Sequence, residues 1–202
     1  MDKKANASTE LLGLVLIGGK SSRMQTDKSA LVYYQRNQLE HTFNLLQEHC
    51  SKVHVACNTQ QFTSIEKWFN PIRDEYEECG PINALLTGFE RFPGKALLVV
   101  AIDMPLLSGK TLKQLIKHRN STKSITTFKS PSKRTMEPLL AIWEPRSYPT
   151  LKKAHNQGHF SLNKSMLLLD VECLHPDHPE ELQNVNTPEE YQKVISALKR
   201  NF

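Results

Sequence analysis

Short apolar runs alternate with helix-like segments along this chain. Each run is either apolar throughout or alternates apolar and polar residues with a period of two, and both patterns are typical of β-strands. The expected strands are residues 11–17, 53–57, 96–102, 124–128 and 139–143. Because helical segments separate strands that are largely apolar throughout, we predict an α/β fold with a mostly parallel sheet covered on both faces.

Four segments space their apolar residues as an amphipathic helix does. Three of the helices are expected within residues 39–49, 84–92 and 112–116. The last has the clearest start, because Thr187 can cap it, Pro188 suits its first position and Glu190 completes a reciprocal capping box. Its buried face is expected to carry Tyr191, Val194, Ile195 and Leu198.

The length of 202 residues favours one domain, and we expect a disordered tail over residues 1–10 before a single domain over 11–202. Hydrophobic residues make up 39% of the chain and charged residues 23%, which excludes a disordered protein. No apolar stretch approaches the roughly 20 residues of a membrane span, and the first ten residues lack the apolar part of a signal peptide. We therefore expect a cytoplasmic protein whose cysteines are reduced and mostly buried.

The net charge is +5, and the sequence contains no run of five or six basic residues. This modest excess favours an anionic small molecule over a nucleic-acid track as the binding partner.

A basic, glycine-containing loop follows the first expected strand. It is not a P-loop, because that motif needs a glycine where this chain has Leu14. Gly18–Gly19 would let the backbone approach phosphates closely, and Lys20, Arg23 and Lys28 would add positive charge. From the residues alone, a phosphate-binding loop and an ordinary turn with solvated basic residues both remain open.

Asp103 stands at the end of the strongest expected strand, residues 96–102. Ligands of open parallel sheets bind outside the carboxyl ends of the strands, where a carboxylate can hold Mg²⁺ together with phosphate oxygens. The alternative is a turn or helix-capping aspartate before Pro105.

Four segments resemble, in order, those of the molybdenum cofactor guanylyltransferases. Leu16–Lys28 resembles the loop L-A-G-G-x-S-x-R-M-G-x-D-K, and Gly80–Ala84 resembles G-P-L-A-G. Val100–Pro105 resembles the strand-end C-D-x-P segment, and Asn184–Glu190 resembles N-x-N-T-P-E-E. The resemblance implies a Rossmann-like three-layer nucleotidyltransferase fold. It also implies that the protein joins the GMP moiety of GTP to molybdopterin and releases pyrophosphate, with Mg²⁺.

The resemblance also implies roles for individual residues. The backbone at Leu16, Ile17 and Gly18–Gly19 would line the nucleotide site. Lys28 and Arg23 would act on the phosphates, Asp103 would hold Mg²⁺, and Asp74 would read guanine. Taken alone, Asp74 is typical of a surface charge. The related cytidylyl enzymes usually carry A-A-G in the loop, so Gly18–Gly19 favours GTP.

Some positions depart from the family pattern. Ile17 replaces an alanine at the start of the loop, Gln25 replaces a glycine, and Ala56 stands where some members have an asparagine that contacts the nucleotide. On the pterin side we expect Ser161, Asn184 and Asn186, although both asparagines also suit turn and cap chemistry.

Two further stretches have simpler interpretations. Residues 166–169 are expected in the core. The tract at 175–179, with two histidines and two prolines, is expected to be an exposed loop rather than a metal site.

Three other functions stay open: transfer from CTP, a sugar phosphate as acceptor, and a non-catalytic nucleotide-binding adaptor. The expected partners are GTP and molybdopterin, with the protein that delivers molybdopterin and the molybdoenzyme chaperones as further candidates. We expect neither a nucleic acid nor a membrane as partner.

Overall fold

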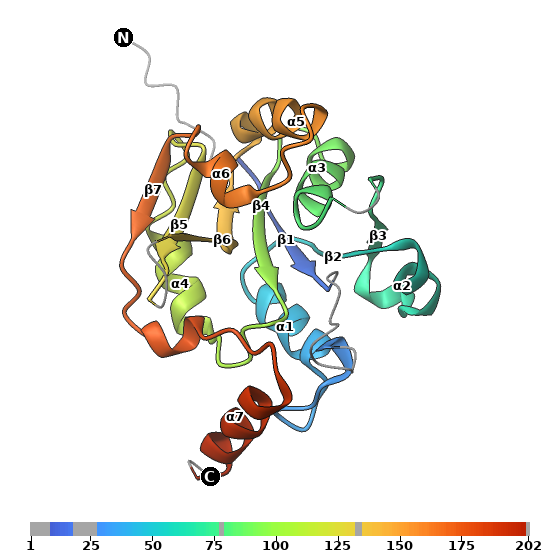
Figure 1. The fold of residues 1–202 in the computed structure, drawn as a ribbon, viewed down its shortest axis with the longest axis vertical. Coiled ribbons are helices and arrows are strands. Elements are labelled where there is room, and N and C mark those ends of the chain that lie inside the picture. Colours follow the sequence, from blue (N-terminus) through green and yellow to red (C-terminus); the bar gives the residue numbers. More distant parts are fainter. Residues whose placement is uncertain (1–8, 18–27, 77–78, 132–134, 201–202) are drawn as a thin grey trace.

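A computed structural model describes residues 9–17, 28–76, 79–131 and 135–200 of the chain (Figure 1). Within these ranges, seven strands form one sheet in the order β3-β2-β1-β4-β6-β5-β7. The strands are β1 (Leu11–Leu16), β2 (Val53–Cys57), β3 (Pro71–Arg73), β4 (Ala96–Ala101), β5 (Ile125–Lys129), β6 (Met136–Trp143) and β7 (Val171–Leu174). The α-helices are α1 (Gln38–Gln47), α2 (Thr59–Ser64), α3 (Ile82–Arg91), α4 (Gly109–Lys117), α5 (Tyr148–Asn156), α6 (Leu162–Met166) and α7 (Pro188–Arg200).

The predicted mostly parallel sheet is confirmed. β1 pairs in parallel with both β2 and β4, and β3 pairs in parallel with β2. β6 runs antiparallel to its neighbours β4 and β5, whereas β5 and β7 are parallel. The carboxyl ends of β1, β2, β3 and β4 therefore lie along the same edge of the sheet.

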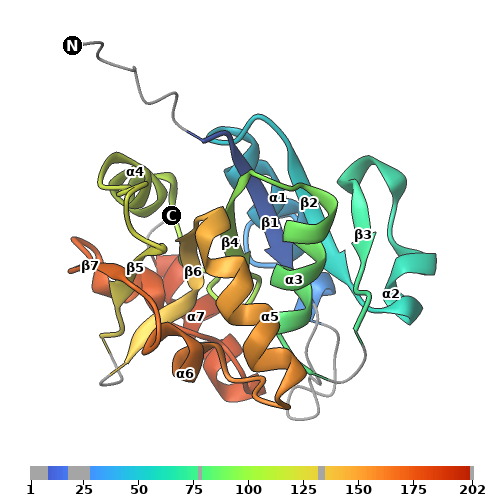
Figure 2. The ribbon, with the colours of Figure 1, turned by 90° about the horizontal axis from the view of Figure 1, so that it is seen from above.

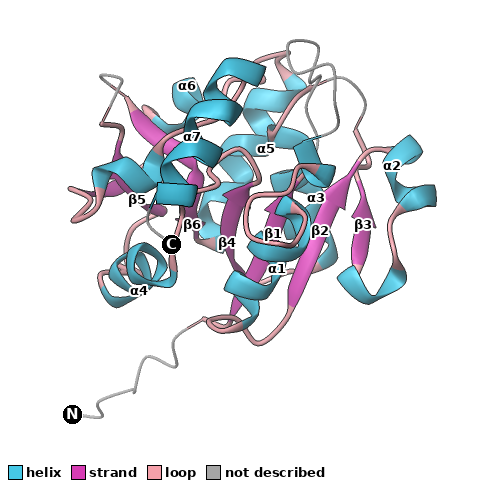
Figure 3. Ribbon diagram, turned by 90° about the horizontal axis from the view of Figure 1, so that it is seen from below, coloured by secondary structure: helices cyan, strands magenta, loops and turns pink. Residues whose placement is uncertain are grey.

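Helices cover both faces of the sheet, so the molecule has three layers. Figures 2 and 3 show α3, α5 and α6 on one face and α1 and α4 on the other. All six residues of β4 are buried, and Val15, Val99 and Ala141 are fully inaccessible to solvent. Burial on both faces explains why the inner strands read as continuous apolar runs in the sequence.

The last helix begins as its capping box predicts. The backbone N–H groups of Asn186 and Thr187 donate to Glu190 Oε2 at 2.6 and 3.1 Å, and the Glu190 N–H donates to Thr187 Oγ1 at 3.2 Å. Val194 is buried on the apolar face. In Figure 1 this helix lies beyond the ends of β1 and β4 toward which their arrows point.

The pattern of apolar residues did not predict β3, β7, α2, α5 and α6. β3 has only three residues, too few to show a period, and β7 is a sheet-edge strand that is only partly buried. Short elements at an edge lack the continuous apolar signal of the inner strands.

The expectation that residues 166–169 belong to the core is wrong at two positions. Met166 is buried, but Leu167 and Leu168 are 77% and 74% exposed. α6 ends at Met166, and the turn that follows no longer keeps one face of the chain against the sheet.

Two smaller expectations also need correction. The sequence of residues 130–134, which contains two serines, a proline, a lysine and an arginine, predicts an exposed loop. Ser130 is nevertheless 4% exposed and donates its N–H to the Thr135 carbonyl oxygen at 2.9 Å. Of the cysteines, which are not joined in disulfides, Cys57 is buried but Cys173 is exposed. None of the described helices combines the length and the apolar character needed to cross a membrane.

One buried ion pair joins the end of α4 to the strand-end segment after β6. Arg119 donates to both carboxylate oxygens of Glu144, Nε to Oε1 at 2.6 Å and a terminal nitrogen to Oε2 at 3.0 Å. The two side chains are 12% and 2% exposed. These two charge-assisted hydrogen bonds replace the water that the Glu144 carboxylate loses on burial.

We predict that Arg119→Ala lowers the free energy of unfolding by about 3 kcal/mol, because it leaves the Glu144 carboxylate buried and unpaired. Arg91→Ala is the control, because Arg91 lies 3.8 Å from Glu75 in a pair whose side chains are both about half exposed. Arg91→Ala should lower the free energy of unfolding by less than about 1 kcal/mol. Urea denaturation measures both, and equal losses would contradict the prediction.

Candidate active site

Three residues predicted for the site follow parallel strands at one edge of the sheet. Ile17 follows β1, Asp74 follows β3, and Asp103 lies just beyond β4. Because these strands are parallel, the residues that follow them emerge on the same side, where open α/β sheets bind their ligands.

Lys28 lies at this edge of the sheet. Its Nζ donates a 2.6 Å hydrogen bond to Asn186 Oδ1, across 158 residues of sequence. Loss of hydration lowers the pKa of the Lys28 ammonium, while the nearby charges of Asp103 and Glu190 act in the opposite direction. The fold thus brings together the predicted residues Lys28, Asp103 and Asn186.

The segment before α7 holds this cluster in place. The Val185 N–H donates to the Asp103 carbonyl oxygen at 2.7 Å. The Tyr191 hydroxyl donates to the Val32 carbonyl oxygen at 3.1 Å. The rings of Tyr191 and Tyr33 pack edge to face, with their centroids 5.1 Å apart. These contacts tie the chain on both sides of the site to α7.

Both asparagines of the N-x-N segment lie at this edge. Asn186 Oδ1 accepts the hydrogen bond from Lys28 Nζ. Asn184 Oδ1 is buried and has no hydrogen-bond partner among the described residues. A buried, unpaired oxygen is costly unless a ligand or water completes it.

Asp74 differs from the surface charge that its sequence context indicates. Its N–H donates to the Cys57 carbonyl oxygen at 2.9 Å, and its Oδ1 is buried without a hydrogen-bond partner in the described part of the chain. Burial raises the pKa of the Asp74 carboxyl to about 7. Perturbed carboxyl groups of this kind are common where a ligand supplies the missing partner.

The nucleotide loop is only partly described. Gly18, Gly19, Lys20, Arg23 and Gln25 lie outside the described residues, so the roles predicted for them stay predictions.

Leu16 and Ile17, at the start of the loop, are joined to the neighbouring strands. The Leu16 carbonyl oxygen accepts the Ile102 N–H at 3.2 Å, and the Ile17 N–H donates to the Ala56 carbonyl oxygen at 3.4 Å. The Ile17 side chain is 6% exposed and belongs to the core. It also borders a cavity of about 200 Å³ next to Gln61, which donates to the Ile17 carbonyl oxygen at 3.5 Å.

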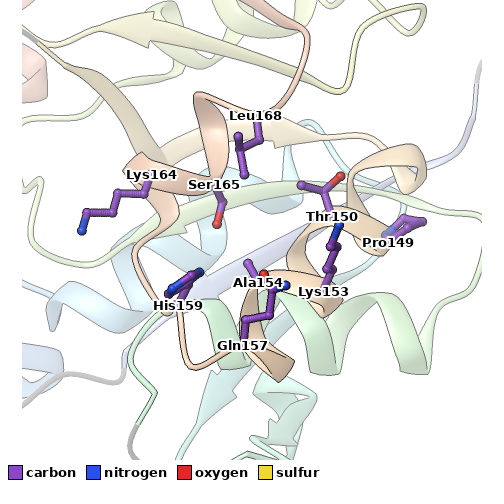
Figure 4. A pocket seen from close by; sticks show the side chains of 9 residues that line it. All are labelled: Pro149, Thr150, Lys153, Ala154, Gln157, His159, Lys164, Ser165 and Leu168. Carbon is purple, nitrogen blue, oxygen red and sulfur yellow. The ribbon is translucent and has the colours of Figure 1, made fainter.

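Ser161, predicted on the pterin side, has a local role. Its hydroxyl accepts the Lys164 N–H at 3.4 Å and caps α6. A cavity of about 690 Å³ lies nearby between α5 and α6 (Figure 4). Lys153, His159 and Lys164 give its lining a basic character, and no residue predicted for the nucleotide site lines it.

The donor set at the strand ends fits a magnesium ion better than a softer metal. No group of three or more His, Cys, Asp or Glu side chains that could hold a metal ion occurs among the described residues, which include the tract at 175–179. Asp103 supplies a hard carboxylate within electrostatic reach of the Lys28 ammonium. Mg²⁺ is typically held by one or two carboxylates together with substrate phosphates and water.

A mostly parallel sheet covered on both faces, with a lysine and carboxylates at the carboxyl ends of its strands, defines an α/β nucleotide-binding domain. Residues 13–170 match the family model of the MobA-like NTP transferase domain. The chain belongs to this family, as its sequence motifs predict.

Two curated relatives and one solved structure illustrate the similarity. The chain is 28% identical over 194 residues to a molybdenum cofactor biosynthesis bifunctional protein of Synechocystis sp., and the match covers 95% of this chain and 56% of that protein. It therefore spans little more than half of that relative. It is 26% identical to the molybdenum cofactor guanylyltransferase of Campylobacter jejuni subsp. doylei, over 94% of this chain and 98% of that protein.

The structural likeness concerns the fold. Molybdopterin-guanine dinucleotide biosynthesis protein A from Archaeoglobus fulgidus superposes with a TM-score of 0.77 at 19% identity, covering 94% of this chain and 99% of that one. The predicted nucleotidyltransferase fold is thereby confirmed.

The raised pKa of Asp74 predicts a dependence of stability on pH. The pKa is about 7 in the folded protein and close to its ordinary value of 3.8 in the unfolded chain. Between these values the folded state retains a proton that the unfolded state releases, so the free energy of unfolding falls as the pH rises from about 4 to about 7 and levels off above that range. Asp74→Asn removes the ionisable group that causes this fall in the free energy of unfolding. The substitution should therefore stabilise the protein at pH 8 by about 2 kcal/mol, which allows for solvent screening of the partly exposed group.

Urea denaturation at pH 5 and pH 8 tests this prediction. Asp177→Asn is the control, because Asp177 is an exposed aspartate in the tract at 175–179. If Asp74→Asn kept the pH dependence of the unmodified protein, the carboxyl would not be held protonated by burial.

Proposed function

We propose that this protein transfers the guanylyl group of GTP to molybdopterin, with release of pyrophosphate. Membership of an NTP transferase family supports the reaction type. The names of the relatives support the acceptor. The observation that carries the choice of base is the buried carboxyl of Asp74, whose Oδ1 has no partner among the described residues.

The chemistry of the bases explains why a carboxylate favours guanine. Guanine presents two adjacent donors, N1–H and the exocyclic amine, and an ionised carboxylate accepts both. A protonated carboxyl instead donates one hydrogen bond and accepts one, which matches cytosine or adenine. Because the pKa of Asp74 is about 7, the preference for GTP is expected to increase as the pH rises from 6 to 8.

The proposed reaction is an in-line displacement at the α-phosphorus. A phosphate oxygen of molybdopterin forms the new bond to phosphorus, and the bond to the bridging oxygen of pyrophosphate breaks. The attacking phosphate is already ionised at neutral pH, so no side chain has to remove a proton from it. Lys28, fixed by Asn186, would neutralise charge that develops on the phosphate oxygens.

Asp103 would hold Mg²⁺, which when bound supplies positive charge to the phosphate oxygens in the transition state. The neighbour of Asn184, Val185, contacts the backbone of Asp103. Asn184 Oδ1, which has no hydrogen-bond partner among the described residues, would accept from the pterin acceptor. We also propose that residues 11–202 form one domain. The proteins that deliver molybdopterin and that receive the product would bind near this edge of the sheet.

Transfer from CTP is the alternative, and nucleotide selectivity separates it from transfer from GTP. Pyrophosphate release is measured with GTP, CTP and ATP in the presence of molybdopterin. We expect Asp74→Ala to lower the kcat/KM preference for GTP over CTP and ATP by about ten- to a hundredfold, because one charge-assisted hydrogen bond contributes roughly 1.5–3 kcal/mol. An unchanged preference would remove Asp74 from the base pocket, and a preference for CTP in the unmodified protein would overturn the assignment of GTP.

Asp103→Asn should lower turnover by roughly a hundredfold or more, because the amide loses the charge that holds the metal ion. The fold should survive, since the backbone carbonyl of Asp103 makes the contact to Val185. Pyrophosphate release at limiting Mg²⁺ is the measurement, with Asp177→Asn as the matched control. A rate near that of the unmodified protein would refute the metal-binding role.

A further inference from the structure

The segment that carries Asp74 has no regular secondary structure. Residues 74–76 follow the short edge strand β3 and belong to neither a helix nor a strand. Apart from the bond of the Asp74 N–H to Cys57, pairing with a strand does not fix their backbone. A carboxyl group that has lost hydration on burial tends to turn toward water. Some other part of the fold has to hold this segment.

Three side chains of α3 hold the segment by hydrogen bonds. Thr87 Oγ1 accepts the Glu75 N–H at 3.0 Å. Asn83 donates its side-chain amide to the Tyr76 carbonyl oxygen at 2.7 Å. Glu90 Oε1 accepts the Tyr76 hydroxyl at 2.6 Å. We call Asn83, Thr87 and Glu90 the α3 clamp.

The clamp residues share one face of the helix because they are spaced at i, i+4 and i+7. Thr87 is fully buried and Asn83 is 4% exposed, so water does not compete for these two bonds. On the opposite side, the Asp74 N–H is held by Cys57 at the end of β2. The segment is thus fixed from a strand on one side and from a helix on the other.

A second helix fixes the outer end of the clamp. Figures 1 and 2 show α3 and α5 side by side. From α5, Lys152 Nζ and the Tyr148 hydroxyl each donate to Glu90 Oε1 at 2.8 Å. Lys152 also donates to the Tyr76 hydroxyl and lies over the Tyr76 ring. This network restricts both the ring and the backbone of Tyr76.

We propose that Asn83, Thr87 and Glu90 are positioning residues for nucleobase selectivity, which hold residues 74–76 so that the Asp74 carboxyl faces the Watson–Crick edge of guanine. The inference rests on the proposed function, in which Asp74 reads the base. The clamp touches neither the phosphates nor the acceptor, so its loss should weaken base recognition and leave the chemical step unchanged. Inosine triphosphate is the appropriate probe, because its base lacks only the exocyclic amine of guanine.

Thr87→Val removes the acceptor for the Glu75 N–H and keeps the shape of the side chain. We expect KM for GTP to rise about three- to tenfold with kcat within about twofold, and the kcat/KM ratio of GTP to inosine triphosphate to fall in proportion. Thr87→Ser keeps the hydroxyl and should restore the ratio. Tyr76→Phe is a milder change, because it removes the hydroxyl that bonds to Glu90 and Lys152 but keeps the ring and the backbone contacts of the segment. It should lower the ratio by about two- to threefold.

Thr111→Val is the matched control. Thr111 is also a fully buried helical threonine, and its Oγ1 has no hydrogen-bond partner in the described part of the chain. Its substitution should leave the ratio unchanged. An unchanged ratio in Thr87→Val, or an equal fall in Thr111→Val, would overturn the clamp.

A second readout keeps failure of the clamp distinct from failure of the proposed function. If the unmodified protein releases no pyrophosphate from GTP, the proposed function fails. The clamp is then judged without nucleotide, by titrating the Asp74 carboxyl with ¹³C NMR. A released segment would let Asp74 reach water, so its pKa should fall toward the ordinary range in Thr87→Val but not in Thr111→Val. An identical Asp74 titration in Thr87→Val and the unmodified protein would refute the clamp.

Discussion

The parallel pairing of β1 with β2 and β4 is the constraint on which the site depends. Helices cover both faces of these strands, so their side chains are apolar except for the half-buried His54 of β2, and the ladder satisfies their peptide groups. A charge in the interior of such a strand would lose its hydration without gaining a partner. Charged side chains therefore occur only beyond the ends of these strands, and parallel pairing puts the carboxyl ends of the strands at the same edge of the sheet. Asp74 and Asp103 lie at one edge for this reason.

The chain returns to this edge near its other end and completes the site. The Glu190 carboxylate makes two kinds of interaction there. Its carboxylate accepts the N–H groups that precede α7, and its charge acts on the Lys28 ammonium. The capping box that starts the helix thus also sets the position of Asn186, which accepts from Lys28. The start of the helix and the position of Lys28 are consequently coupled through the same carboxylate.

The inner architecture could be predicted from sequence because burial on both faces leaves a continuous apolar signal, as in 96–102. The edges could not be predicted this way. β3 is three residues long and shows no period, so the sequence gives no sign that Asp74 follows a strand. The same gap explains why Asp74 alone resembles a surface charge. Thr87 and Asn83 look like ordinary helix residues, and only the path of residues 74–76 beside α3 shows that they bind its backbone.

The burial of Asp74 is a cost that stability alone does not explain. An asparagine there would avoid the loss of hydration that raises the carboxyl pKa to about 7, yet it could not accept two hydrogen bonds from adjacent donors. The α3 clamp also orders the irregular segment at residues 74–76, because the buried polar side chains of Asn83 and Thr87 bind its backbone. The burial of the Asp74 carboxyl opposes stability locally. In the proposed function this cost is offset when a base with paired donors completes the carboxyl, so the site would act as a preorganised acceptor whose cost in the free protein is the source of its selectivity.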